Sequence, residues 1–419
     1  MKGYFLTELK FLSRRLWRKW GKVIGTFGLA LIIAFGSARI WAKDTGQELD
    51  LWLLSRFFHQ RGPRPLPNDI VIVSIDDESY VRLREAYPDY ERRLSPRWPF
   101  PRRFEAEALE NIIKAKPRAI IIDLRFAADA DDPAADARIE EALRTAPTSI
   151  WSGKTPQPGS DFRVSDGTQY VTLPSELRFR AAAKMQLDML IAGHFGVFAR
   201  LTLDDRPEAS LYERVPLARP LVELAQFKVE APGRFDLINF YGPPQTIPRI
   251  PLYRLVGERA GDIREKLQGK VVLFGFLSAT RGLVGNKDAH PIPGSDDLMP
   301  GTEIHATIAA NLVDRTWLHR YPTEVEVQSI FLAALLLSLC GVALPFEKGA
   351  PLVAALVAAA TWLSYLAFAH FFVWLPGLPV VAAAALIALL CGAVRHNIGL
   401  RRFKGYLKRT FGFELERKL

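Results

Sequence analysis

Acidic side chains cluster directly after the first short β-branched run of the chain. The run 69–75 predicts a buried strand, and Asp76 and Asp77 follow it at once. A second run, 119–124, predicts another buried strand and carries Asp123 near its end. Because ligands of open α/β sheets bind beyond the carboxyl ends of the strands, these carboxylates are candidate ligand-binding residues. They can bind a cation or act as acid and base; the alternative is helix capping by Asp76 or Asp77.

A proline-rich segment between these two strands supplies a tryptophan and two arginines. Trp98 lies between Arg97 and Pro99, and Arg102 follows Pro101. The structural interpretation is a stiff turn that starts a helix at Pro101, because proline favours the first helical turn. The functional interpretation is that Arg102 is held where it binds an anion or the carboxylates at the strand ends. The two interpretations are compatible.

Other signals for chemistry are weak. Histidines and carboxylates gather over residues 288–305, but their spacing matches no zinc signature, and Glu303 and His305 lie two apart on a predicted helix and face different sides. Both cysteines, Cys340 and Cys391, lie in apolar runs. The sequence has no phosphate-binding glycine loop, nucleophile elbow, kinase motif or cyclase motif. We therefore expect no catalytic residue, no metal and no cofactor, and we do not expect an enzyme.

The elements that position these residues indicate a mixed α/β domain with a partly parallel sheet. Apolar residues at helical spacing predict a helix over 101–115, between the first two strands. Strand, helix and strand in that order are typical of a crossover connection between parallel strands. Further strands are predicted at 235–240 and 270–275, and a helix is predicted to begin at Gly301.

Four apolar segments predict an all-α membrane region beside this domain. Each approaches the roughly 20 residues that a helix needs to cross the hydrocarbon layer. A signal peptide is the alternative for the first, but its basic lead is long and Arg39 to Trp41 is a poor cleavage site. Buried helices of a soluble protein are the alternative for the others, but they carry no polar stripe. The predicted spans are 23–41, 325–344, 350–373 and 376–394.

The net charge of +10 is concentrated beside these apolar segments. Basic blocks occupy the N-terminus, 1–22, and the amphipathic tail, 395–419. The pattern is typical of cytoplasmic flanks and contacts with anionic lipid, so we expect a lipid bilayer as partner and no nucleic acid. This predicts a multi-pass bacterial inner-membrane protein with both termini in the cytoplasm and residues 43–322 outside. The tail is interpreted as a helix on the inner leaflet, or as a signalling helix that pairs with a partner.

The order of several motifs resembles the type-two CHASE extracellular sensor domain. The resemblance covers about 43–320, and the three following spans also match the usual layout of that family. It implies an extracytoplasmic sensory domain whose signal passes to a cytoplasmic nucleotide cyclase, kinase or diguanylate cyclase, and a possible homodimer. Asp288 corresponds to an aspartate loop of the family, although 278–287 matches loosely. The motifs that carry the resemblance are 69–79, 98–102, 120–126, 271–275 and 300–306.

The leading hypothesis is therefore a non-enzymatic membrane receptor. Its outer domain detects a small molecule, a protein or an envelope condition, and a separate cytoplasmic effector responds. Since about 25 residues follow the last span, we expect either signalling in trans or a chain shortened before its effector. The alternatives are a structural or assembly subunit that binds a protein partner, and an extracytoplasmic hydrolase. The candidate ligand-binding residues are Asp76, Asp77, Trp98, Arg102, Asp123 and Asp288.

Overall fold

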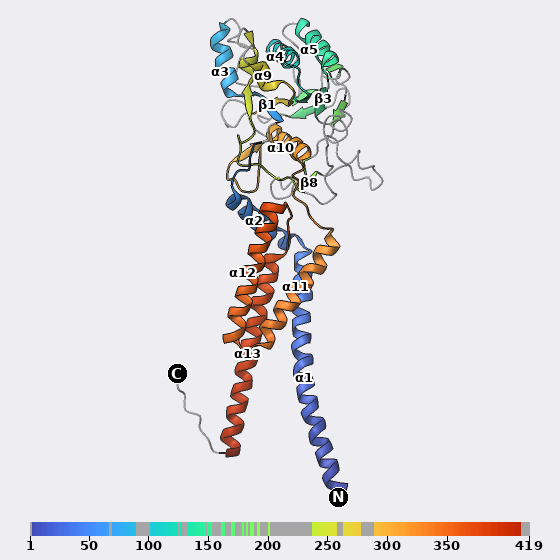
Figure 1. The fold of residues 1–419 in the computed structure, drawn as a ribbon, viewed down its shortest axis with the longest axis vertical. Helices are drawn as coiled ribbons and strands as arrows, with labels where there is room; N and C mark the ends of the chain where they lie inside the picture. Colours follow the sequence, from blue (N-terminus) through green and yellow to red (C-terminus); the bar gives the residue numbers. More distant parts are fainter. Residues whose placement is uncertain are drawn as a thin grey trace. The chain divides into compact units, whose positions relative to one another are not determined.

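A computed structural model of the 419-residue chain separates into two compact units (Figure 1). The helical unit comprises Met1–Leu54 and Arg320–Leu419, and the α/β unit comprises Ser55–His319. The structure describes residues 2–66, 69–88, 101–124, 126, 133–147, 149–152, 161–163, 169–171, 178–179, 182, 185–187, 191–192, 200–201, 237–257, 263–277 and 289–411.

Among the described residues, four helices of the helical unit are long and apolar enough to cross a membrane. The first lies within α1 (Lys2–Trp41) and covers Gly21–Trp41. It is followed along the chain by α2 (Asp44–Arg61), which is polar. The other three candidate spans are α11 (Thr323–Ala343), α12 (Phe346–Phe371) and the segment Leu378–Asn397 of α13 (Leu378–Phe411).

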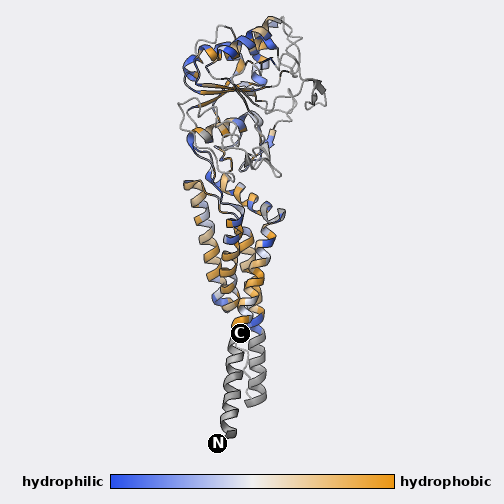
Figure 2. Ribbon diagram, turned by 90° about the vertical axis from the view of Figure 1, so that its right-hand side faces the viewer, coloured by the Kyte–Doolittle hydropathy of each residue, from blue (hydrophilic) through white to orange (hydrophobic). Residues whose placement is uncertain are grey.

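The span helices expose large apolar side chains and pack through small ones, as expected in lipid. Leu336, Leu363 and Val394 are more than half exposed, and Figure 2 shows apolar residues all along these helices. Inside the bundle, a Cβ on Gly392 would lie 2.3 Å from the carbonyl oxygen of Gly341. The backbones of α11 and α13 therefore meet where neither helix carries a side chain.

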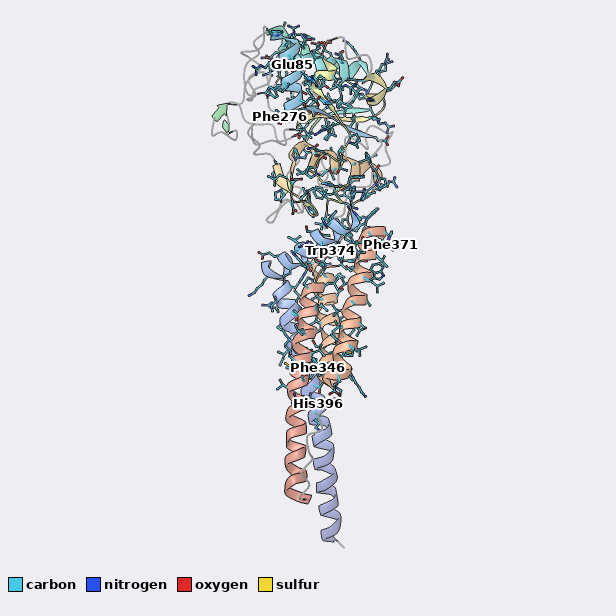
Figure 3. The ribbon with its side chains drawn as sticks, turned by 90° about the vertical axis from the view of Figure 1, so that its left-hand side faces the viewer. Glu85, Phe276, Phe346, Phe371, Trp374 and His396 are labelled. Atoms are coloured by element: carbon cyan, nitrogen blue, oxygen red, sulfur yellow. The ribbon has the colours of Figure 1, made fainter. Side chains whose placement is uncertain are left out.

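Aromatic and polar side chains lie at the ends of the spans. Phe346 and His396 lie near one end of the bundle, and Phe371 and Trp374 lie near the other (Figure 3). α12 begins at Phe346, four residues before the third predicted span at 350–373, and it contains Pro351 near its start. Pro351 lies in the second turn of α12, where it removes a backbone N–H that would otherwise donate to the carbonyl oxygen of Glu347. The tail to Phe411 continues α13 without interruption.

The α/β unit is built on a six-stranded sheet in the order β6-β3-β2-β10-β1-β9, and every pair of neighbours is parallel. This confirms the predicted mixed α/β class. The predicted β1 to β2 crossover exists, but β10 lies between the two strands. The strands are β1 (Ile70–Ile75), β2 (Ala119–Asp123), β3 (Ser149–Ser152), β6 (Met185–Leu187), β9 (Arg249–Pro251) and β10 (Val271–Phe276).

Helices cover both faces of this sheet (Figure 1). On one face, α3, α4, α5 and α9 surround a core that includes Val73, Phe104, Ile122 and Phe274. On the other face, α10 packs against β1 and β10. The helices are α3 (Asp77–Ala86), α4 (Arg102–Lys114), α5 (Pro133–Thr145), α9 (Arg264–Leu267) and α10 (Gly301–Asp314), with a 3-10 turn η2 (Leu252–Leu255).

Short antiparallel pairs complete the described part of the α/β unit. They are β4 (Asp161–Arg163) with β5 (Gln169–Val171), β7 (Ile191–Ala192) with β8 (Arg200–Leu201), and β11 (Ala289–Pro291) with β12 (Leu298–Pro300). The strand predicted at 235–240 is wrong where the structure describes it. Leu237 makes an isolated bridge to Leu318, and 238–240 are irregular. The backbone N–H of Asn239 donates to Asn311 Oδ1 of α10 instead of to a neighbouring strand, and its side-chain amide donates to the carbonyl oxygen of Thr316.

Candidate functional site

Asp76 caps α3. Its Oδ1 accepts hydrogen bonds from the backbone N–H of Ser79 at 2.8 Å and from Ser79 Oγ at 2.7 Å. Its Oδ2 accepts from Ser74 Oγ at 2.6 Å, and the residue is buried. These are the contacts of an N-cap, which satisfies an amide that has no partner inside the helix. The capping alternative therefore describes Asp76, whereas Asp77 begins the helix as its first residue.

Small and polar residues form a row across the three central strands near their carboxyl ends. Ser74 of β1 lies in register with Gly275 of β10, and Gly275 lies in register with Asp123 of β2. Side chains alternate between the faces of a strand, and the neighbours Val73, Ile122 and Phe274 all enter the core beneath α4. The row of Ser74, Gly275 and Asp123 therefore faces α10.

The first turns of α10 bond to the end of this row. Thr302 Oγ1 donates to Asp123 Oδ2 at 2.7 Å, and His305 Nδ1 lies 3.0 Å from the same oxygen. Thr302 and His305 are three residues apart, so they share one face of the helix. We call Asp123, Thr302 and His305 the Asp123 cluster. Its members are mostly withdrawn from solvent, with 16% of the Asp123 side chain and 10% of the His305 side chain exposed.

Gly275 allows α10 to approach the sheet this closely. A Cβ built on Gly275 would lie 2.5 Å from Thr302 Cγ2 and 2.6 Å from Thr302 Oγ1, distances that real Cβ atoms essentially never show. Any side chain at Gly275 would therefore push the first turn of α10 away from β10. The same movement would break the bonds from Thr302 and His305 to Asp123.

The Asp123 cluster joins a carboxylate to an imidazole. A carboxylate beside Nδ1 favours the ring form that carries a proton on Nδ1, and it stabilises the doubly protonated imidazolium more strongly. Such a pair can hold or release a proton, and it can reorient when a ligand competes for either partner. It lies beyond the carboxyl ends of parallel strands, where sheets of this kind place their ligands.

The neighbouring carboxylate on α10 has a different role. Glu303 is fully buried and accepts hydrogen bonds from the backbone N–H groups of Gln245 at 2.9 Å and Ile247 at 3.2 Å. Burial raises its pKa, and the backbone donors oppose that effect. As expected from their spacing, Glu303 and His305 bond to different parts of the unit. Glu303 therefore fixes the 245–247 loop to α10.

Arg102 lies on the opposite face of the sheet from the Asp123 cluster. Its Nε is 3.5 Å from Glu105 Oε2 and its Nη1 is 3.6 Å from Asp136 Oδ1. The guanidinium also stacks over Phe126, 4.3 Å from the ring centroid. These carboxylates come from α4 and α5, whereas the sequence pointed to those of the strand ends. The difference arises because α4 covers the face away from α10.

The three charges of this group, which we call the Arg102 cluster, are strongly coupled. Arg102 and Glu105 are almost wholly buried. Burial raises the pKa of Glu105 to about 8, the positive charge of Arg102 opposes this, and Asp136 adds to it. Asp136 also lies 4.0 Å from Nη2 of Arg178, so it has a second positive partner. Glu105 is the more deeply buried carboxylate, and this burial favours a proton on Glu105 at neutral pH.

The structure describes only some of the expected site residues. Trp98 and Asp288 lie outside the described residues, and so does most of the loop after β10. Asp76, Asp123 and Arg102 are described, but they occupy a helix cap and two different faces of the sheet. Within the described residues, no group of three or more His, Cys, Asp or Glu side chains is placed to hold a metal ion.

The sequence analysis did not predict that Thr302 and His305 contact Asp123. It considered His305 only as a metal ligand and did not single out Thr302. A usable signal was present, since Thr302 and His305 are polar residues three apart at the start of the predicted helix, and such a pair indicates a helix face that meets a polar partner. Which strand carries that partner depends on how α10 docks, and this is a long-range property of the fold.

Comparisons with known proteins agree with this architecture. The family model for the CHASE2 domain matches residues 26–342, which include the whole α/β unit and most of the two spans that flank it. No curated protein and no solved structure matches the chain. Because the match covers well over half of the sequence, this membrane protein belongs to the CHASE2 domain family.

Proposed function

We propose that the chain is an inner-membrane receptor whose α/β unit lies outside the cytoplasm and signals to a cytoplasmic effector. The observation that carries the proposal is the CHASE2 match, because CHASE2 is a family of sensor domains and the match extends into the spans on both sides of the α/β unit. A sensor that is continuous with two spans has a direct covalent route to the membrane.

Contacts in the helical unit support the proposal that both termini lie on the same side of the membrane. Arg395 of α13 donates hydrogen bonds to Thr26 Oγ1 and to the carbonyl oxygen of Lys22 at 2.9 Å, both on α1. The last residue of the basic block 1–22 and the first residue of the basic block 395–419 therefore lie at the same end of the bundle. Since basic flanks favour the cytoplasmic side, we infer that both termini are cytoplasmic and that the α/β unit is extracytoplasmic.

The Asp123 cluster is the part of the α/β unit that we assign to signal detection. In this cluster, Oδ2 of Asp123 at the end of β2 contacts both Thr302 and His305 in the first turns of α10. A ligand changes a conformational equilibrium only if it binds the two states unequally. A small molecule or protein group that competes for Asp123 or His305 would meet this condition, because α10 loses two bonds when it binds.

Reporter fusions test the orientation. A reporter that is active only outside the cytoplasm is fused after residue 160, and a reporter that fluoresces only inside is fused after residue 411. We expect both fusions to be active, and the exchanged pair to be inactive. Activity of the exchanged pair instead would place the α/β unit in the cytoplasm and remove the basis for the receptor.

A chimaera tests signalling without knowledge of the natural effector. The catalytic module of a diguanylate cyclase is fused after Leu419, and cyclic dinucleotide is measured in cells that produce the full chain, Asp123→Asn or the control Asp296→Asn, which alters an exposed aspartate of the same unit. We expect Asp123→Asn to change the output at least threefold at equal protein level, and Asp296→Asn to leave it unchanged. If removal of residues 62–318 also leaves the output unchanged, the α/β unit does not signal, and an assembly subunit that binds a protein partner replaces the receptor.

The same preparations test the oligomeric state and the partner. We propose a homodimer, since two copies bring two effector modules together. Mass measurement of the full chain in detergent is expected to give twice the mass of one chain. A monomer that still supports regulated output in the chimaera would exclude dimerisation as the signalling step.

A further inference from the structure

One carboxylate of the helical unit is buried where three segments meet. Asp50 lies on α2 and is 4% exposed. The indole N–H of Trp41, the last residue of α1, donates to its Oδ2. The backbone N–H of Gly377, in the loop before α13, lies 2.8 Å from each carboxylate oxygen. A single side chain thus holds α2 to both α1 and the loop.

The donor from the loop is fixed in position. Gly377 has φ +93°, a conformation that side chains rarely permit, and a Cβ there would lie 2.2 Å from Ile330 of α11. The N–H of Gly377 cannot turn away without moving the loop off α11. The site for the Asp50 carboxylate is therefore built by the backbone and by Trp41.

The neighbouring charges leave Asp50 incompletely compensated. Arg320 donates from Nε to Glu326 Oε1 at 3.0 Å and from Nη2 to Glu326 Oε2 at 2.6 Å. This fork is directed at Glu326, although its positive charge also acts on Asp50. From the other elements, α1 contributes an uncharged indole, and the 372–377 loop contains no titratable residue. Two carboxylates thus share the charge of one arginine.

We propose that Asp50 is a proton-sensitive latch that sets how firmly the first half of α2 is held to α1 and to the 372–377 loop. The latch lies outside the candidate spans and is separate from the Asp123 cluster. Residues of α2 up to Leu54 belong to the helical unit, and those from Ser55 belong to the α/β unit. The same helix that Asp50 fastens therefore continues into the sensor domain.

The direction of the proton effect follows from burial. Burial raises the pKa of Asp50 from 3.8 to about 6, and Glu326 adds to this, while Trp41, Gly377 and Arg320 oppose it. The packed state thus binds a proton more readily than an open state does. The latch is strongest below the open-state pKa and weakens as the pH rises through about 6. Between pH 5.0 and 7.5 the closed-to-open ratio falls roughly tenfold.

Hydrogen exchange on the full chain in lipid nanodiscs tests the latch. Exchange of peptides that cover 42–54 and 372–378 is followed at pH 5.0 and 7.5, and the known pH dependence of amide chemistry is divided out. We expect protection of both peptides to be about tenfold higher at pH 5.0. Asp50→Asn, which carries no charge, should give the protection of the pH 5.0 protein at both pH values.

Two further variants make the outcome decisive. Glu48→Gln alters an exposed carboxylate on the same helix and should retain the full pH response. Glu326→Gln leaves Arg320 to act on Asp50 alone, so the midpoint of the response should move to lower pH. The proposal is overturned if the chain shows no pH response in these peptides, or if Asp50→Asn responds as the unaltered chain does. If Asp50→Asn does not fold, an unmoved midpoint in Glu326→Gln overturns the proposal equally.

Discussion

The two faces of the central sheet are covered in different ways. Beneath α4 and α5, large apolar side chains such as Phe104 and Phe274 interlock, and the charges of the Arg102 cluster are enclosed at one side. Beneath α10, a row of Ser74, Gly275 and Asp123 brings helix and sheet into close contact through hydrogen bonds. The packing of the first face depends on the volume of apolar side chains, and the packing of the second depends on the close approach of helix and sheet. Removing side-chain volume should therefore destabilise the first face most, and adding volume should destabilise the second face most.

The largest effect is expected from loss of volume on the apolar face. Phe104 is completely buried in the core beneath α4. Phe104→Ala should lower the free energy of unfolding by about 3–5 kcal/mol, because the lost apolar contacts leave a cavity. The free energy of unfolding is measured by titrating the full chain in detergent with denaturant, and the protease resistance of the α/β unit reports how much of the chain remains folded. A loss below about 1 kcal/mol would mean that this face can collapse around the cavity.

The next effect is expected from added volume on the α10 face. Gly275→Val should cost about 3 kcal/mol, because its side chain would overlap Thr302. The same unfolding assay measures the change. Thr302→Ala shortens the obstructing side chain, so the double variant should recover part of the loss. If Gly275→Val unfolds at the same denaturant concentration as the unaltered chain, α10 does not need to approach the sheet so closely.

Loss of charge in the Asp123 cluster should have a moderate effect. Asp123→Asn keeps the size of the side chain but weakens the bonds from Thr302 and His305, which should cost about 1–2 kcal/mol. The imidazole NMR signals of His305 should also shift, since the carboxylate no longer stabilises a proton on Nδ1. Unchanged His305 signals would show that Asp123 does not orient the ring. Asp296→Asn, at an exposed aspartate of the same unit, is the matched control.

Because of the Arg102 cluster, the free energy of unfolding should depend on pH in the alkaline range. The pKa of Glu105 is raised to about 8 in the folded chain, so its contribution is complete below its unfolded pKa and is lost as the pH rises through 8. Unfolding free energy should fall by about 1 kcal/mol between pH 7 and pH 9. Glu105→Gln should remove this slope, whereas the neighbouring Glu107→Gln should retain it. An identical slope in both variants would assign the effect to another group.

The smallest effect is expected at the edge of the α4 and α5 layer. Arg138 donates from Nε and Nη2 to the carboxylate of Glu110 at 2.7 Å, but 37% of its side chain is exposed. Solvent screens such pairs, so Arg138→Ala should cost less than about 1 kcal/mol. A measured loss above 2 kcal/mol would mean that this pair, rather than the apolar contacts, holds α5 to α4.

Much of the fold was accessible from local sequence patterns. β1, β2 and β10 are β-branched runs bounded by turn residues, and α4 and α10 begin after Pro101 and Pro300, where a helix accepts proline. The sequence did not predict α5, β3 or β9. These elements are short or weakly patterned, and they acquire their structure from the strands and helices beside them.

The candidate site was less predictable because it depends on sheet order and strand direction. Asp123 was selected as the end of a strand, and this placement is correct. Its partners come from α10, 179 and 182 residues further along the chain. Arg102, near the start of the helix predicted between two strands, was expected to bind an anion or the strand-end carboxylates. No local pattern indicates which face of the sheet that helix covers, and this decides the partners of Arg102.

The uninterrupted course of α13 has a mechanical consequence. Its 34 residues include a candidate span and extend to Phe411, so at about 1.5 Å per residue the helix is roughly 51 Å long. Because α13 is one continuous helix from Leu378 to Phe411, a rotation of the span about its axis also rotates the part of the helix beyond the span. Each residue added within 398–411 would turn whatever follows by about 100°, so function should vary with insertion length at a period near 3.6 residues.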